Sequence, residues 1–102
     1  MLTSKQRAYL KSLAMVMDPI IYIGKASLTP ENTINIEEAL AARELVKVGV
    51  HQNCLDDPRE IAEIVAERTH SEIVQVIGKK IVLYRPGKDK NRKIELPRAK
   101  KS

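Results

Sequence analysis

A glycine, a lysine and a serine stand between a short apolar run and a helix start in the stretch "YIGKASLTPE". Gly24 lets the backbone approach a partner closely, Lys25 offers a compact positive charge, and Ser27 offers a hydroxyl donor. Thr29-Pro30 then opens a helix whose first N–H groups and dipole favour an anion. Together these residue types indicate a site for a phosphate group. An ordinary solvated turn is the alternative interpretation.

The other chemistry-bearing residues form no catalytic or metal-binding pattern. His51 and His70 stand nineteen residues apart without a cysteine or carboxylate cluster at ligand spacing, and neither lies in a nucleophile motif. The Gly-Lys pairs at Gly24 and Gly78 lack the upstream glycine of a nucleotide-binding P-loop. We therefore expect no metal, no cofactor, no small-molecule substrate and no enzymatic activity.

Positive charge is concentrated in the last part of the chain. Residues 1–84 carry ten Lys and Arg against eleven Asp and Glu, a net charge of −1, whereas residues 85–102 carry eight against two, a net charge of +6. Such a segment attracts a polyanion, and phosphate backbones are the commonest polyanions in the cytosol. A solvated segment that only keeps the protein soluble is the alternative.

Composition limits the size and the class of the fold. A chain of 102 residues, 43% of them apolar, can build one domain but not two separate cores. With three Tyr and no Trp or Phe, stacking of RNA bases on an aromatic platform is disfavoured. The single cysteine, Cys54, fits a reducing compartment. Without a signal peptide or an apolar run of membrane-spanning length, the chain is expected to be a cytoplasmic monomer that contacts no membrane.

The elements that position these residues follow from hydrophobic periodicity. Leu10, Ala14 and Met17 lie at helical spacing, and Asp18-Pro19 is expected to stop this first helix near Met17. Two further helices are expected to begin where a capping residue precedes a proline, at Thr29-Pro30 and Asp57-Pro58. The strands are expected in the apolar runs "PIIYI", "ELVKVGVHQ", "EIVQVI" and "KIVLY", of which the last two form a hairpin.

This order, helix-strand-helix-strand-helix-strand-strand, predicts an α/β domain with a small mixed four-stranded sheet. Strands joined through helices are expected to be parallel neighbours, and the final hairpin must be antiparallel. Helices are expected to cover much of the sheet. We assign residues 1–86 to a single domain, and residues 87–102 to a basic, extended tail with too little apolar surface to order without a partner.

Three stretches of the sequence resemble one family. "IGKASLT", "EALAARELVKV" and "VQVIGKKIVLYRP" are similar to the CRM domain (chloroplast RNA splicing and ribosome maturation) in its small stand-alone bacterial form, the YhbY type. The resemblance covers residues 3–97. It implies a helix-covered four-stranded mixed sheet similar to the C-terminal domain of translation initiation factor three. It also implies RNA binding, with the bacterial members associated with precursors of the large ribosomal subunit.

The corner loop departs from the family pattern at one residue. The family has Gly-Lys-x-Gly there, resembling the backbone clamp of KH domains, and this pattern maps onto Gly24, Lys25, Ala26 and Ser27. A serine at the fourth position costs about 1 kcal/mol relative to glycine if the loop needs a positive φ. Ser27 is therefore a poorer candidate for a backbone contact than Gly24 or Lys25.

The sequence thus predicts a non-catalytic RNA-binding protein that acts on ribosomal RNA or on precursors of the large ribosomal subunit during ribosome assembly. The alternative is an adaptor that binds a ribosomal protein or an assembly factor. The expected RNA contacts are the corner loop, exposed lysines of the first helix and cations near the C-terminus: Gly24, Lys25, Ala26, Ser27, Lys5, Lys11, Arg85, Lys88, Lys90, Arg92 and Lys93.

Overall fold

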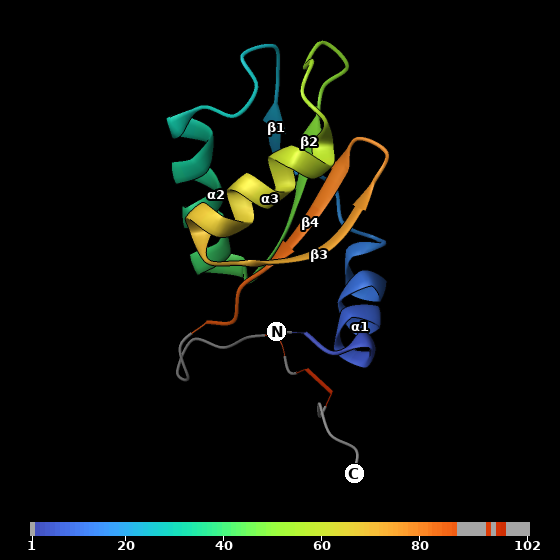
Figure 1. The fold of residues 1–102 in the computed structure, drawn as a ribbon. Coiled ribbons are helices and arrows are strands. Elements are labelled where there is room, and N and C mark those ends of the chain that lie inside the picture. The colour runs from blue at the N-terminus through green and yellow to red at the C-terminus, as the bar shows by residue number, and fades with distance from the viewer. Residues whose placement is uncertain (1, 88–93, 95, 98–102) are drawn as a thin grey trace.

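The helices and strands occur in the predicted order (Figure 1). The structure is a computed structural model and describes residues 2–87, 94, 96 and 97. The elements of this part of the chain are α1 (Ser4–Ala14), β1 (Ile21–Ile23), α2 (Pro30–Arg43), β2 (Leu45–Val50), α3 (Pro58–Thr69), β3 (Glu72–Ile77) and β4 (Lys80–Tyr84). The predicted α/β class, with three helices and a mixed sheet, is confirmed.

The four strands form one sheet in the order β1-β2-β4-β3. β1 is parallel to β2, and β3 and β4 form the expected antiparallel hairpin. The expectation that β2 and β3 are parallel neighbours is wrong, because β4 lies between them and pairs antiparallel with both. The turn at Gly78, where φ is 56°, folds β4 back beside β2. Glycine suits this turn because a left-handed φ costs it little.

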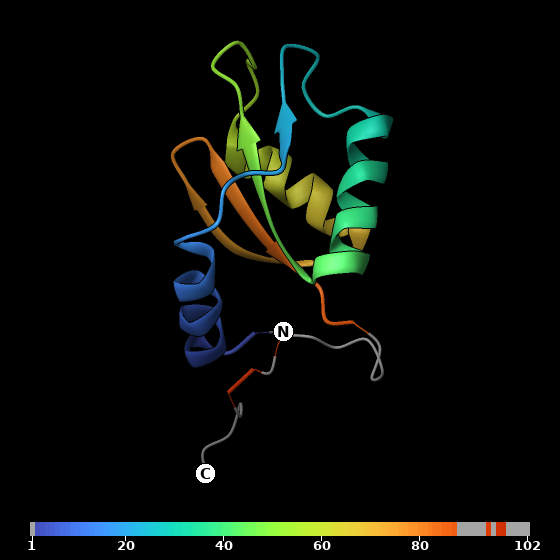
Figure 2. The same cartoon turned by 180° about the vertical axis from the view of Figure 1, so that it is seen from behind.

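Helices cover the two faces of the sheet unequally (Figure 1, Figure 2). Neighbouring residues of a strand point to opposite faces, so Val46 and Val48 of β2 pack with α2 and α3, whereas Leu45 packs with α1. α2 and α3 bury the larger core cluster, and α1 buries the smaller one through Leu10 and Ala14. Each fully buried aliphatic side chain contributes about 1.5 to 3 kcal/mol of hydrophobic stabilisation.

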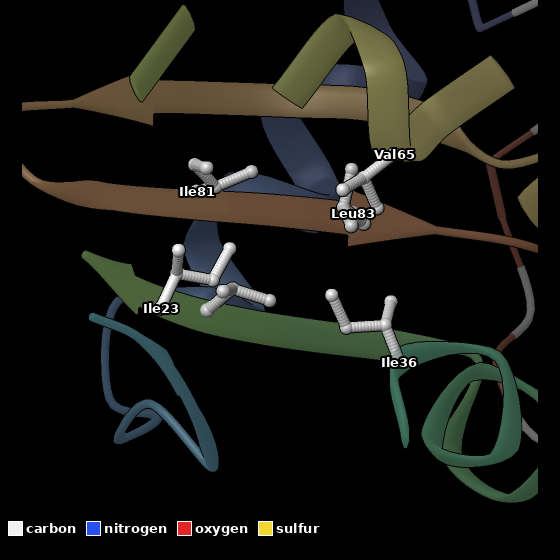
Figure 3. A pocket seen from close by; sticks show the side chains of 6 residues that line it. Ile23, Ile36, Val65, Ile81 and Leu83 are labelled. Atoms are coloured by element: carbon white, nitrogen blue, oxygen red, sulfur yellow. The ribbon is translucent and has the colours of Figure 1, made fainter. Parts of the chain in front are cut away.

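The core beneath α2 and α3 offers no ligand site. A narrow apolar gap there has no room for a water molecule, which is typical of close-packed interiors. Figure 3 shows the side chains that line it, which are Ile23, Ile36, Val48, Val65, Ile81 and Leu83. This gap in the core therefore offers no room for a ligand.

α1 ends at Ala14, earlier than the predicted end near Met17. One further turn follows, in which the Met17 N–H donates to the Ala14 carbonyl at 3.0 Å. The Met17 carbonyl accepts from Lys47 Nζ at 2.8 Å, so a side chain of β2 replaces the next helical hydrogen bond. Met17 still packs against the α1 cluster, as its helical spacing with Leu10 predicted.

Part of the predicted tail packs on the folded body. Ile94 and Leu96 lie against the α1 cluster, and Gln6 Nε2 donates to the Pro97 carbonyl at 3.0 Å. These two aliphatic side chains therefore find an apolar surface on the α1 side of the sheet, while the extended conformation of the tail stays a prediction. The remaining residues of the tail lie outside the described part, and the boundary at residue 86 stays a prediction.

Glu44 anchors this segment from the interior. The residue is 1% exposed, and its φ of 68° lies in the left-handed region. Glu44 Oε2 accepts from the Gly87 N–H at 2.5 Å, and Oε1 accepts from the Ile94 N–H at 2.7 Å. A buried carboxylate is tolerated only when hydrogen bonds replace its hydration, and the two amides provide them.

The helices that the structure describes are too short or too polar to cross a lipid bilayer.

Candidate nucleic-acid interface

The corner loop is a tight turn that presents Lys25 to solvent. The Ser27 N–H donates to the Gly24 carbonyl at 2.8 Å, which closes the turn and leaves Lys25 and Ala26 exposed at its tip. The Ser27 amide is thus already used within the turn. A contact of Ser27 with RNA stays a prediction.

A second loop, residues 51–57, supports the corner loop from the side. The two loops lie next to each other at one end of the sheet (Figure 1, Figure 2). The His51 N–H donates to the Ile23 carbonyl at 2.8 Å, and Ser27 Oγ donates to Asp56 Oδ2. Lys25 is therefore carried on a turn that is fixed at both sides.

The fold itself does not need a glycine at position 24. Among the glycines only Gly78 has a left-handed φ, so Gly24 adopts a backbone conformation open to other residues. A Cβ atom on Gly24 would meet only His51 Cδ2, at an ordinary contact distance of 3.8 Å. Neither strain nor crowding within the fold therefore requires a glycine at this position.

The start of α2 contributes less to anion binding than the sequence indicated. Thr29 Oγ1 accepts from the Asn32 N–H at 3.0 Å, and Asn32 Oδ1 accepts from the Thr29 N–H at 3.2 Å. This capping box uses one of the helix-start amides, and Pro30 has no N–H to offer. Glu31 also lies in the first turn, so Lys25 is the main feature here that attracts a phosphate.

Two variants test how Ser27 is held. Its φ of 62° carries the predicted left-handed cost, while the hydrogen bond to Asp56 offsets part of it. Ser27→Ala is expected to lower the free energy of unfolding by about 1 kcal/mol, because the bond is lost and the strain stays. Ser27→Gly should recover most of that loss. Thermal melting of the two variants decides the question, and an alanine variant as stable as the glycine variant would contradict the left-handed strain.

Lys5 and Lys11 lie on the exposed side of α1, as predicted. Lys5 is not brought near the corner loop, because the start of α1 is at the opposite end of the sheet (Figure 1, Figure 2). Lys11 instead lines a groove of about 360 Å³ along the edge strand β3, together with Arg7 and Arg59. Arg7 Nη1 also donates to the Ile73 carbonyl, so this guanidinium already covers part of the strand edge.

Arg85 is held by contacts within the protein. Its Nη1 donates to Glu37 Oε2 at 2.7 Å and to the Thr69 carbonyl at 2.8 Å, and so joins α2 to the end of α3. An RNA phosphate would have to replace these partners, so Arg85 is a weaker candidate than the sequence indicated. The other predicted cations of the tail, Lys88, Lys90, Arg92 and Lys93, lie outside the described residues, and their contacts stay predictions.

Sequence reasoning missed an exposed lysine and an aromatic pair. Lys80 is exposed at the start of β4 and pairs with Gly49, which in turn pairs with Tyr22 of β1. The Tyr22 and His51 rings stack with their centroids 4.8 Å apart and their planes inclined by 12°. In the sequence, the alternation of residues in β2 indicated which face of the strand Gly49 is on. The position of Lys80 beside Gly49 could be found only from the pairing of β2 with β4.

Metal or thiol chemistry has no visible site in the described part of the chain. No group of three or more His, Cys, Asp or Glu side chains there is arranged to hold a metal ion. Cys54 is 3% exposed and packs in the larger core cluster.

The family assignment rests on nearly the whole folded body. Residues 2–85 match the family described as the CRS1 / YhbY (CRM) domain. The chain belongs to this family. This match confirms the family resemblance, which the sequence carries in the corner loop, at the end of α2 with β2, and in the β3–β4 hairpin. Ser27 of this CRM domain stands where the loop pattern implied by the resemblance has a glycine.

Relatives of this CRM domain are named for RNA binding. "Probable RNA-binding protein YqeI" of Bacillus subtilis is 45% identical over 97 residues, which cover 95% of this chain and 100% of the relative. A protein of Haemophilus influenzae named "RNA-binding protein" is 37% identical, over 95% of this chain and 96% of the relative. The solution structure of the hypothetical protein SAV1595 from Staphylococcus aureus is 52% identical and superposes with a TM-score of 0.80, covering 95% of this chain and 100% of that one.

Proposed function

We propose that this CRM domain is a non-catalytic RNA-binding protein. It acts in the cytoplasm on ribosomal RNA or on precursors of the large ribosomal subunit. The observation that carries the proposal is the corner loop, where Lys25 is exposed next to a glycine that the fold does not require. The names of the relatives support the same class of partner.

Local charge, and not the charge of the folded body, has to attract the RNA. Residues 1–84 have a net charge of −1, and Asp56 lies beside the corner loop, so long-range attraction to this part of the chain is weak. Lys25 on its fixed turn gives a defined phosphate contact, and the positive charge of the tail adds attraction to the RNA backbone. The loop therefore sets the orientation of the RNA, and the tail raises its affinity.

The test is binding of the purified full chain to purified large-subunit ribosomal RNA. Affinity is expected to fall steeply as salt rises from about 50 to 200 mM, because phosphate contacts release counterions. An RNA of unrelated sequence and equal length serves as the comparison, and weaker binding to it supports ribosomal specificity. Tight, salt-insensitive binding to a ribosomal protein, with no binding to RNA, would instead establish the adaptor function.

Lys25→Ala is expected to lower RNA affinity several-fold with little effect on melting. An exposed turn residue rarely changes the free energy of unfolding by more than about 0.5 kcal/mol, whereas a phosphate contact is lost entirely. Affinity is measured by a binding titration at moderate salt. Arg68→Gln is the matched control, because it removes an exposed cation from the last turn of α3, away from the corner loop.

Gly24→Ala tests the approach of RNA to the loop backbone separately from the charge of Lys25, in the same binding experiment. The added methyl group fits the fold, so melting should be unchanged, but it obstructs a phosphate that approaches the turn. Unchanged affinity in both the Gly24 and the Lys25 variants would reduce this corner to an ordinary solvated turn.

A further inference from the structure

An aromatic surface lies directly beside the corner loop. Tyr22 is 50% exposed although it belongs to β1, and its ring stacks on the exposed ring of His51. The His51 ring also reaches the corner loop, since its Cδ2 atom lies 3.8 Å from where a Cβ of Gly24 would be. The two rings and the loop therefore form one continuous surface.

The pair lies on a part of the sheet that no described helix covers. Ile23 points into the cluster under α2 and α3, so Tyr22 points to the opposite face, where α1 lies. Figure 2 views this face and shows α1 beyond one end of β1, with the ends of β1 and β2 near the loops left open. The Tyr22 ring is thus accessible from outside the protein.

The absence of a side chain at Gly49 leaves room for the tyrosine ring. A Cβ at Gly49 would lie 2.6 Å from Tyr22 Cε1 and 2.8 Å from Tyr22 Cδ1, closer than atoms can approach. The ring therefore lies over the backbone of the neighbouring strand at Gly49, and it stacks on His51. Such a ring loses little freedom when another flat group stacks on it.

Positive charge flanks this surface on two sides. Lys25 lies on the corner loop. Lys80 pairs with Gly49, which pairs with Tyr22, so these three residues form one row across β1, β2 and β4. An aromatic face between two exposed lysines suits a group that combines a flat ring with phosphates, which is the chemistry of a nucleotide. An apolar protein partner would gain nothing from this pair of charges.

We infer that Tyr22 and His51 form a stacking site for one unpaired base of single-stranded RNA. The base stacks on the ring pair while the adjoining phosphate lies at Lys25. This inference rests on the proposed function and extends it. Base stacking requires an unpaired nucleotide, whereas phosphate contacts alone would also accept a duplex. Although aromatic residues are few in this sequence, the fold places one beside the corner loop, where such a base would meet the phosphate contact described above.

The test compares two probes of equal charge with the full chain. One is an oligouridylate of about ten nucleotides, and the other is an abasic oligomer with the same sugar-phosphate backbone. Tyr22→Leu keeps an apolar cover over Gly49 but has no aromatic face, so affinity for oligouridylate should fall about tenfold. Affinity for the abasic oligomer should stay the same. Tyr22→Phe, which keeps the ring, should bind both probes like the unaltered protein.

A second pair of variants keeps the result interpretable. His51→Gln removes the second ring of the Tyr22–His51 pair, at an exposed position. It should weaken oligouridylate binding by several-fold, again without effect on the abasic oligomer. Lys25→Ala should weaken both probes equally. Equal losses of the Tyr22→Leu variant on both probes, or no loss on either, would overturn the stacking site while phosphate binding stands. Failure of the unaltered protein to bind any RNA would instead overturn the proposed function, and the stacking site with it.

Discussion

Replacing Lys88, Lys90, Arg92 and Lys93 together with glutamine is expected to weaken RNA binding near physiological salt by at least about tenfold. These residues supply half of the eight cations among residues 85–102. Each phosphate contact contributes about −0.7 to the slope of log affinity against log salt on single-stranded RNA. If three or four of these cations touch phosphate, the slope becomes shallower by about 2 to 3 units.

Substitution is a sharper experiment than removal of the tail. Ending the chain after Pro86 would also remove Ile94 and Leu96, which pack against the α1 cluster, and the two amides that bind Glu44. The glutamine variant keeps these contacts and should melt like the unaltered protein. Preference among RNA sequences should also persist, because backbone contacts carry no sequence information. An unchanged salt slope would show that these four cations do not contact phosphate, and would leave Lys5, Lys11 and Lys25 to be tested together with Arg98, Lys100 and Lys101.

Glu44→Ala is expected to produce the largest loss of stability. The carboxylate is buried, and its two oxygens accept from Gly87 and Ile94 at 2.5 and 2.7 Å. Removing the carboxylate leaves the Gly87 and Ile94 amides without this charged partner. Each hydrogen bond to a charged group contributes about 1.5 to 3 kcal/mol to stability. A loss of about 2 to 4 kcal/mol follows, and for a domain of this size it lowers the melting temperature by about 10 °C or more.

Limited proteolysis gives a second measurement on the same variant. Without Glu44 the segment around Ile94 should be cut before the rest of the protein unfolds, because its hydrogen bonds to the body are lost. Glu38→Ala, which removes an exposed carboxylate of α2, is the control and should change neither melting nor cleavage. A Glu44→Ala protein with unchanged melting and unchanged cleavage would show that the segment is held by its aliphatic side chains alone.

Local signals in the sequence placed most of the elements correctly. Thr29-Pro30 and Asp57-Pro58 begin α2 and α3 as predicted, because a capping side chain and a proline act within one turn of the chain. Gly78 likewise marks the β3–β4 turn through its own φ. The family resemblance added the loop pattern, and with it the observation that Ser27 replaces a glycine at a left-handed position.

Contacts between distant residues could not be read from such signals. The insertion of β4 between β2 and β3, the burial of Glu44 and the pairing of Arg85 with Glu37 all join residues far apart in the chain. The candidate site shows the same division. Gly24 and Lys25 are adjacent in sequence and were found, whereas the stacking of Tyr22 on His51 depends on the parallel register of β1 and β2.

The packing of Ile94 and Leu96 against α1 has a consequence for the order of folding. The cluster under α2 and α3 draws on residues from Ile23 to Leu83, whereas the α1 cluster also joins Leu10 and Ala14 to Ile94 and Leu96, 80 to 86 positions later. Closing such a long loop costs entropy before any contact repays it. Refolding should therefore build the α2–α3 side first and complete the α1 side in a slower step. During synthesis, the face that carries α1 cannot be finished until nearly the whole chain has been made.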